Sequence, residues 1–224
     1  MSRNPLNYSD SQMKCMNGDG KNGNSAGFSQ CVIKGIEDAQ ENYKNMSGGC
    51  WAWEGAEYWL TVHVALSLWE LIGDGQVTVE TRGKDGMEAA GRNRGPRRRI
   101  VDNSMKFDIL LWHKNEAARA PIEIKSQQTD KNLIIKDVKR VIAALMGSGM
   151  KFGIVGYYFS RTRSERKSAM ERVESYVVDL EDRCKNIKDV KNKRIRILSR
   201  YSKIHGDKED AWIAGSLLLE ELKN

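Results

Sequence analysis

The sequence is poor in the residues that build cross-linked or extended proteins. Its 224 residues include only 4 cysteines and 3 prolines, which excludes a disulfide-dense scaffold and a Pro-rich chain. The cysteines form no Cys-x-x-Cys pair, and the 3 histidines are far apart in the chain. We therefore expect reduced thiols and no structural zinc site.

Long apolar runs are missing as well. The most apolar stretch, around Trp59–Trp69, is interrupted by polar residues and is shorter than the roughly 20 residues that cross a bilayer. The first residues, MSRNPLNYSDSQMK, lack the apolar centre of a secretory signal. These features predict a cytoplasmic protein that has no membrane partner.

The composition is that of a folded soluble protein, with 40% hydrophobic and 30% charged residues. The 37 basic and 30 acidic residues give a net charge of +7, which fits either a polyanionic partner such as nucleic acid or an ordinary basic surface. Residues 1–50 are rich in Gly, Asn and Ser and are predicted to be a polar N-terminal extension with a short helix over about 32–44. Residues 51–224 are predicted to form one domain.

Hydrophobic periodicity predicts an α/β fold with a mixed sheet flanked by helices. Beyond the central region, we expect a helix over 164–185, an edge strand over 194–201 and a closing helix over 207–222. In the central region the predicted order is a helix at 54–72, strands at 77–81, 107–112 and 121–127, a helix at 134–146 and a strand at 152–159.

Two of these strands carry acidic and basic residues at alternating positions. Asp108 lies between apolar residues of the second strand, and Glu123 and Lys125 alternate with Ile122 and Ile124 in the third. Because successive side chains of a strand point to opposite faces, Phe107, Ile109, Leu111, Ile122 and Ile124 should share a buried face. Asp108, Glu123 and Lys125 should then share the other face, either as a functional cluster or as a solvated surface with an ion pair.

Two neighbouring carboxylates and an amine suit metal-assisted chemistry on a phosphate. Carboxylates held close together raise each other's pKa, and a hard divalent cation removes this cost by binding their oxygens. Lys125 follows Glu123 by two residues, about 7 Å along the same face. It could orient an attacking water or balance charge on the phosphate.

The residues Phe107-Asp108, fourteen intervening residues and then Glu123-Ile124-Lys125 resemble the motif of the PD-(D/E)XK nucleases, with Phe107 in place of the proline. The resemblance covers about residues 54–159, and it implies the restriction-endonuclease-like αβββαβ core of that family. It also implies a DNA nuclease, most often an endonuclease, that depends on Mg²⁺ or Mn²⁺. Homodimers are common among such enzymes.

The resemblance also assigns roles to individual residues. Asp108 and Glu123 would ligate the metal, with the carbonyl of Ile124 as a further ligand, and Lys125 would be the catalytic lysine. A glutamate of the first core helix often joins them, and Glu57 is our choice, with Glu54 one turn earlier as its rival. Gln127 and Glu80 are accessory residues that could face the same site, although Glu80 also fits an ordinary strand-end position.

Basic residues before and after the motif are predicted to contact nucleic acid. Clustered basic side chains neutralise phosphates, but a solvated loop or the exposed face of a helix would look the same in sequence. Two other functions stay open, namely a catalytically inactive nucleic-acid-binding or interaction module on the same fold and an RNA-directed nuclease. The basic residues are Arg92, Arg94, Arg97, Arg98, Arg99, Lys136, Lys139 and Arg140.

Overall fold

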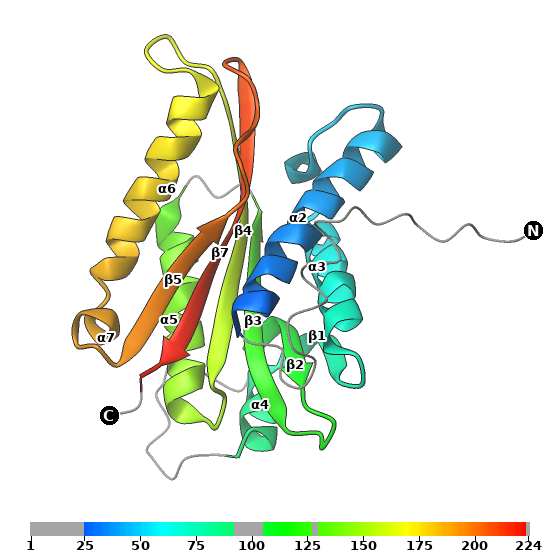
Figure 1. Ribbon diagram of the computed structural model, residues 1–224, viewed down its shortest axis with the longest axis vertical. Helices are drawn as coiled ribbons and strands as arrows, with labels where there is room; N and C mark the ends of the chain where they lie inside the picture. Colours follow the sequence, from blue (N-terminus) through cyan, green and yellow to red (C-terminus); the bar gives the residue numbers. More distant parts are fainter. Residues whose placement is uncertain (1–24, 92–104, 127–129, 223–224) are drawn as a thin grey trace, which may run out of the picture.

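A mixed β-sheet forms the centre of the molecule (Figure 1). The computed structural model describes residues 25–91, 105–126 and 130–222. In these residues the seven strands follow the order β1-β2-β3-β4-β7-β5, with β6 paired to β7. Only β3 and β4 run parallel, and all other neighbours are antiparallel. The strands are β1 (Gln76–Arg82), β2 (Lys106–Trp112), β3 (Ala118–Ser126), β4 (Phe152–Thr162), β5 (Ile195–Tyr201), β6 (His205–Gly206) and β7 (Asp210–Glu221).

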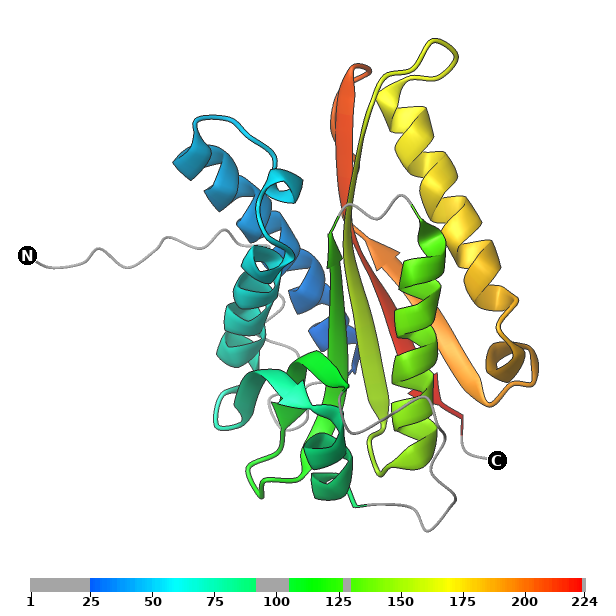
Figure 2. The ribbon, with the colours of Figure 1, turned by 180° about the vertical axis from the view of Figure 1, so that it is seen from behind.

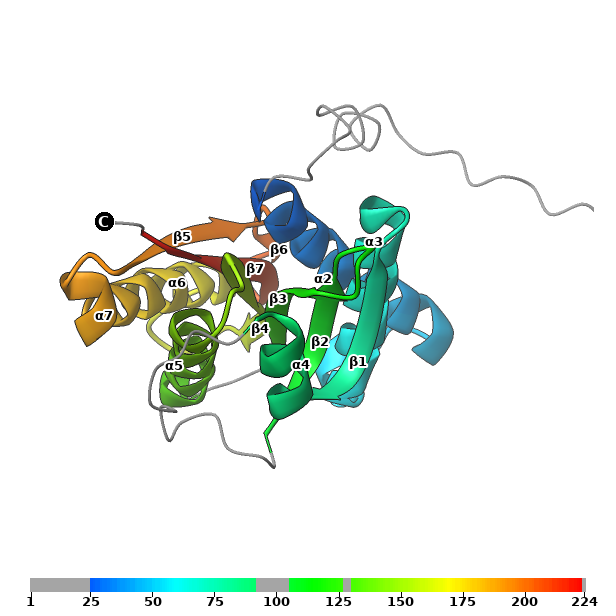
Figure 3. The ribbon, with the colours of Figure 1, turned by 90° about the horizontal axis from the view of Figure 1, so that it is seen from below.

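Helices cover both faces of this sheet, as the views from behind and from below show (Figures 2 and 3). The pair α2 and α3 packs on one face, and α5 and α6 pack on the other. The predicted class, an α/β fold with a mixed sheet flanked by helices, is therefore confirmed. The helices are α2 (Ser25–Ser47), η1 (Ala52–Glu54), α3 (Glu57–Ile72), α4 (Gly83–Ala89), α5 (Lys131–Gly147), α6 (Ala169–Lys185) and α7 (Lys188–Lys191).

Two hydrophobic clusters, one on each face, hold the layers together. Val155 and Tyr157 of β4 point into the cluster under α5 and α6, and Ile154 and Tyr158 point into the cluster under α2 and α3. The alternation follows from the pleat of the strand. Because both faces of β4 are covered, its sequence is almost continuously apolar, as expected for a central strand.

Helix α2 extends the short helix predicted over 32–44 and belongs to the core. Phe28, Val32 and Ile36 are fully buried against the sheet and α3. Gly35 is needed for this packing, because a Cβ at that position would lie 2.6 Å from the Cα of Val64 in α3. Residues 25–47 thus pack with the sheet rather than outside it.

The connection from β3 through α5 to β4 positions the candidate active site described below. Parallel neighbours need such a crossover, and it brings the carboxyl ends of β3 and β4 to the same edge of the sheet. Asp130 starts α5 by accepting a hydrogen bond from the amide of Asn132 at 2.9 Å. Helix α5 therefore begins next to the end of β3 and runs back along the sheet (Figure 2).

The prediction of a closing helix over 207–222 is wrong. Residues 210–221 form β7, which lies between β4 and β5 and pairs with β4 from Asp210 to Glu220. Leu217 and Leu219 face one cluster and Ala214 and Leu218 face the other. A strand buried on both faces reads as a continuous apolar run, which periodicity alone does not separate from a buried helix.

The segment after β1 begins with a short helix that the sequence did not predict. Its first residues form α4, which packs against β1, β2 and α5. None of the helices in residues 25–91, 105–126 and 130–222 has the length and apolarity to cross a bilayer.

Candidate active site

Asp108 and Glu123 lie side by side on neighbouring strands. The register of β2 and β3 pairs Ile109 with Ile122, so the next step of the ladder brings Asp108 beside Glu123. Their carboxyl groups are hydrogen-bonded to each other, and Asp108 Oδ2 also accepts a hydrogen bond from the amide of Ile124 at 2.7 Å. Two acids that are far apart in the chain thus meet as the sequence predicted.

The face that carries Glu123 is not a solvated surface. Glu123 is only 1% exposed, and its register partner Val155 belongs to the cluster under α5 and α6. The alternative of an exposed sheet face with a surface ion pair is therefore wrong for this residue. Of the five apolar residues predicted to share the opposite face, four do, but Phe107 packs with the α5 side. The ladder is irregular there, since Glu80 next to Asp108 has a φ of 53°.

The two carboxyl groups hold protons unusually strongly. Burial, together with the neighbouring Asp108, raises the pKa of Glu123 well above its usual value, although Arg140 opposes this. Burial also raises the pKa of Asp108, against the opposing effects of the Ile124 amide and the charge of Lys125. Of the two acids, Glu123 is therefore the harder to ionise.

Lys125 and Glu57 join the pair from β3 and the first turn of α3. Lys125 Nζ lies 3.1 Å from Glu57 Oε1, and Glu57 Oε2 accepts a hydrogen bond from the amide of Ser126 at 2.9 Å. Burial lowers the pKa of Lys125, but the charges of Asp137, Glu57 and Asp108 together raise it above its usual value. Lys125 is therefore a fixed positive charge beside the two acids.

Helix α5 adds a residue that the sequence analysis missed. Asp137 is 3% exposed and lies 3.5 Å from Lys125 Nζ and 2.8 Å from Arg140 Nη1. A signal for it exists in the sequence, because Asp137 occupies a position of the helical stripe of Ile134, Val138 and Val141, which are all buried. A charged residue on the inward face of a helix needs a partner.

Arg140 was predicted to contact nucleic acid, but it lies inside the cluster. Its Nη2 is 3.1 Å from Glu123 Oε1 and donates to the carbonyl of Lys106 at 2.7 Å. Of the other basic residues on α5, Lys136 and Lys139 are exposed, as expected for the outer face of an amphipathic helix. The predicted Arg92, Arg94, Arg97, Arg98 and Arg99, and the accessory Gln127, lie outside the described residues.

The two remaining predicted acids have local partners. Glu54 accepts a hydrogen bond from the amide of Trp51 at 3.3 Å and is exposed, so it caps η1 while Glu57 reaches Lys125. Glu80 forms an exposed ion pair with Lys106 at 3.2 Å. Of the two helix glutamates, the structure brings Glu57 to the cluster.

The charge of the cluster suits a divalent cation. The side chains of Glu57, Asp108, Glu123 and Asp137 supply four carboxyl groups, and Lys125 and Arg140 supply two positive charges. With all four acids ionised, the sum is −2, which one divalent cation neutralises. Among the described residues, Glu123 Oε1 and Asp137 Oδ2 are buried without a hydrogen bond, although each lies near a cation.

The side chains do not form a complete metal cage by themselves. In the part of the chain that the structure describes, no three Asp, Glu, His or Cys side chains are arranged to hold an ion together. Asp108 and Glu123 provide two oxygen ligands, and Ile124, which follows Glu123 in the chain, donates its amide to Asp108. Hard cations such as Mg²⁺ use few protein ligands and keep several waters, so this donor set fits one.

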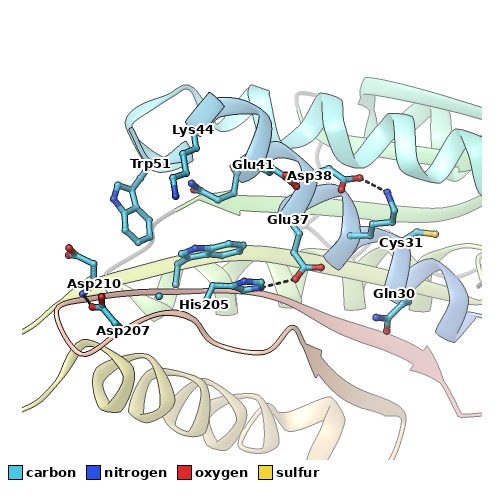
Figure 4. Close-up of a pocket in the computed structure, with 14 residues that line it drawn as sticks. Gln30, Cys31, Glu37, Asp38, Glu41, Lys44, Trp51, His205, Asp207 and Asp210 are labelled. Carbon is cyan, nitrogen blue, oxygen red and sulfur yellow. Dashed lines mark hydrogen bonds and ion pairs between the residues drawn. The ribbon is translucent and has the colours of Figure 1, made fainter. Parts of the chain in front are cut away.

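A separate cavity of about 820 Å³ lies between α2 and the turn that joins β6 to β7 (Figure 4). Glu37 of α2 and His205 of β6 meet across it at 2.8 Å, and Lys34 pairs with Asp38 at 2.5 Å. The ring of His205 stacks on Trp212 at a centroid distance of 4.1 Å. This cavity holds none of the predicted site residues.

Comparisons with known proteins do not add to the assignment. No family model, no curated protein and no solved structure matches this chain. The function is therefore inferred from the geometry of the cluster.

Proposed function

We propose that this protein is a Mg²⁺-dependent nuclease that hydrolyses phosphodiester bonds of DNA on a restriction-endonuclease-like αβββαβ core. The observation that carries the proposal is the meeting of Asp108, Glu123 and Lys125 on paired strands, with Glu57 of the preceding helix beside the lysine. The order of elements from α3 to β4 supports it, with the short α4 added between β1 and β2. Mn²⁺ should replace Mg²⁺, since both take oxygen ligands.

In the proposed site, the cation is held by Asp108, Glu123 and the carbonyl of Ile124. Glu57 supplies the third carboxylate of the site. A bound divalent ion supplies a water of lowered pKa and stabilises charge on the phosphate. Lys125 orients the attacking water and faces the phosphate with its positive charge. Glu57 and Asp137 keep the lysine in place, because the carboxylates of both contact its ammonium.

The basic residues extend the site toward the nucleic acid. Lys136 and Lys139 lie on the exposed face of α5, the helix that carries Asp137 and Arg140. Exposed cations there would contact phosphates of a strand that enters the cluster, and binding should weaken as salt rises. The five arginines between residues 92 and 99 precede the strand of Asp108 in the chain and are proposed to contribute in the same way.

The proposal is tested with Glu123→Ala and Lys125→Ala in a plasmid-cleavage assay with Mg²⁺. We expect each variant to lose at least about 100-fold in rate, since each removes a metal ligand or the group that positions the water. Asp182→Asn is the control, because Asp182 is an exposed acid on α6 that pairs only locally, with Lys185. Cleavage by either site variant at the wild-type rate would contradict the assigned roles.

The same assay separates the alternatives. Competition between DNA and RNA substrates identifies an RNA-directed enzyme, which would use the same residues. An inactive binding module would bind nucleic acid without cleaving it, and a calorimetric titration with Mn²⁺ would then find no site. Loss of cleavage on addition of a chelator is expected if the cation takes part.

A further inference from the structure

Arg140 is the one described cation that contacts Glu123. Its guanidinium lies 3.1 Å from Glu123 Oε1, and its side chain is 22% exposed while that of Glu123 is 1% exposed. The contact is an ion pair rather than a hydrogen bond, because Glu123 Oε1 has no hydrogen-bond partner among the described residues. A positive charge therefore lies beside a carboxyl group that the proposed function assigns as a metal ligand.

The position of Arg140 is fixed by groups other than Glu123. Nη1 donates to Asp137 Oδ1 at 2.8 Å, and Nη2 donates to the carbonyl of Lys106 at 2.7 Å. One anchor is on the same helix, three residues earlier, and the other is the backbone of β2, the strand that carries Asp108. The guanidinium thus keeps its place beside Glu123 when the carboxylate takes another partner.

We propose that Arg140 is a resident cation of the cluster, held beside Glu123 by other groups, that sets how tightly the site holds a divalent ion. This inference rests on the proposed function and adds a regulating role that a nucleic-acid contact would not have. A fixed positive charge a few ångströms from the ion opposes binding, and burial strengthens the effect because the local dielectric is low. Arg140 therefore keeps the affinity for the cation lower than the four acids alone would give.

The test measures binding of Mn²⁺ by calorimetry on the full chain without nucleic acid, at low ionic strength. Arg140→Gln removes the charge and should bind Mn²⁺ on the order of tenfold more tightly than the wild type. Arg140→Lys keeps a positive charge and should bind about as the wild type does. Lys151→Gln is the control for net charge, because Lys151 is an exposed lysine that precedes β4 at the other end of the sheet.

The outcomes separate this inference from the proposed function. Tighter binding by Arg140→Gln but not by Lys151→Gln supports the inference, and so does binding that appears only when Arg140 is replaced. Wild-type binding that Arg140→Gln leaves unchanged or weakens overturns the inference alone. Absence of binding in the wild type and in Arg140→Gln overturns both.

A second variant covers the case in which Arg140→Gln does not fold. Asp137→Asn removes one negative charge from the same cluster and leaves Arg140 with its Lys106 anchor. The opposite sign is then expected, a Mn²⁺ affinity lower than that of the wild type. An unchanged or higher affinity in Asp137→Asn would overturn the inference.

Discussion

The carboxylate of Glu57 lies 3.1 Å from the ammonium of Lys125, although the two residues are separated by 68 positions in the chain. The same carboxylate accepts a hydrogen bond from the amide of Ser126, so it joins the first turn of α3 to the end of β3. This contact positions the lysine beside Asp108 and Glu123. It also distinguishes Glu57 from Glu54, which caps η1 instead.

Replacing Glu57 should therefore reduce stability and DNA cleavage more than replacing Glu54. Glu57→Ala removes two contacts of a half-exposed carboxylate, and we expect the free energy of unfolding to fall by about 1 kcal/mol. Cleavage of DNA should fall much further, because Lys125 loses the partner that holds it. Urea denaturation and the plasmid assay measure the two effects. Cleavage by Glu57→Ala at the wild-type rate would contradict the role of Glu57.

The buried acid of α5 should matter more for stability. Asp137→Ala leaves Lys125 and Arg140 without their shared partner, and removing one member of a buried pair costs about 3 kcal/mol. Asp182→Ala is a matched control, since Asp182 also pairs with a cation three residues later, but on an exposed surface. It should change the free energy of unfolding by less than about 0.5 kcal/mol. Similar losses in both variants would contradict the role of Asp137.

The raised pKa values of Glu123 and Asp108 predict how stability depends on pH. Both acids keep their protons in the folded state at pH values where the unfolded chain has lost them. The folded state then binds more protons, so the free energy of unfolding should fall as the pH rises above the ordinary carboxyl pKa. Each group contributes at most about 1.4 kcal/mol per pH unit.

Glu123→Gln isolates this effect. The variant keeps the shape of the side chain but has no titrating group, so its unfolding free energy should depend less on pH than that of the wild type above the ordinary carboxyl pKa. Mn²⁺ should stabilise the wild type at pH 7, because it binds the folded state, and should stabilise the variant less. Identical pH profiles would show that Glu123 is not held in its protonated form.

The central position of β7 predicts a large effect of a cavity there. Leu218 is 1% exposed and lies under α2 and α3, so Leu218→Ala should lower the free energy of unfolding by about 2–5 kcal/mol. Leu66→Ala is the control, since Leu66 is 53% exposed on α3 and should change stability by less than about 0.5 kcal/mol. A small effect at Leu218 would contradict its burial in the sheet under α2 and α3.

Short-range periodicity of the sequence predicted many of the helices and strands. Alternation in the segments around Asp108 and Glu123 predicted two strands, and helical spacing predicted α3, α5 and α6, because side-chain periodicity depends only on local geometry. The same alternation placed Glu123 and Lys125 on one face. The closing segment was predicted wrongly for a related reason, since a strand covered on both faces loses its alternation.

The sequence alone thus determined that this chain forms helices and strands in an α/β arrangement and that two acids and a lysine occur at strand positions suited to a shared face. Only the tertiary structure decided that the face is buried under α5, that β7 completes the sheet, and that Asp137 and Arg140 enter the cluster. These features depend on which elements pack together over long separations in the chain. An exposed charge has almost no effect on the free energy of folding, whereas a buried charge costs several kcal/mol. The local sequence does not determine which charges are buried.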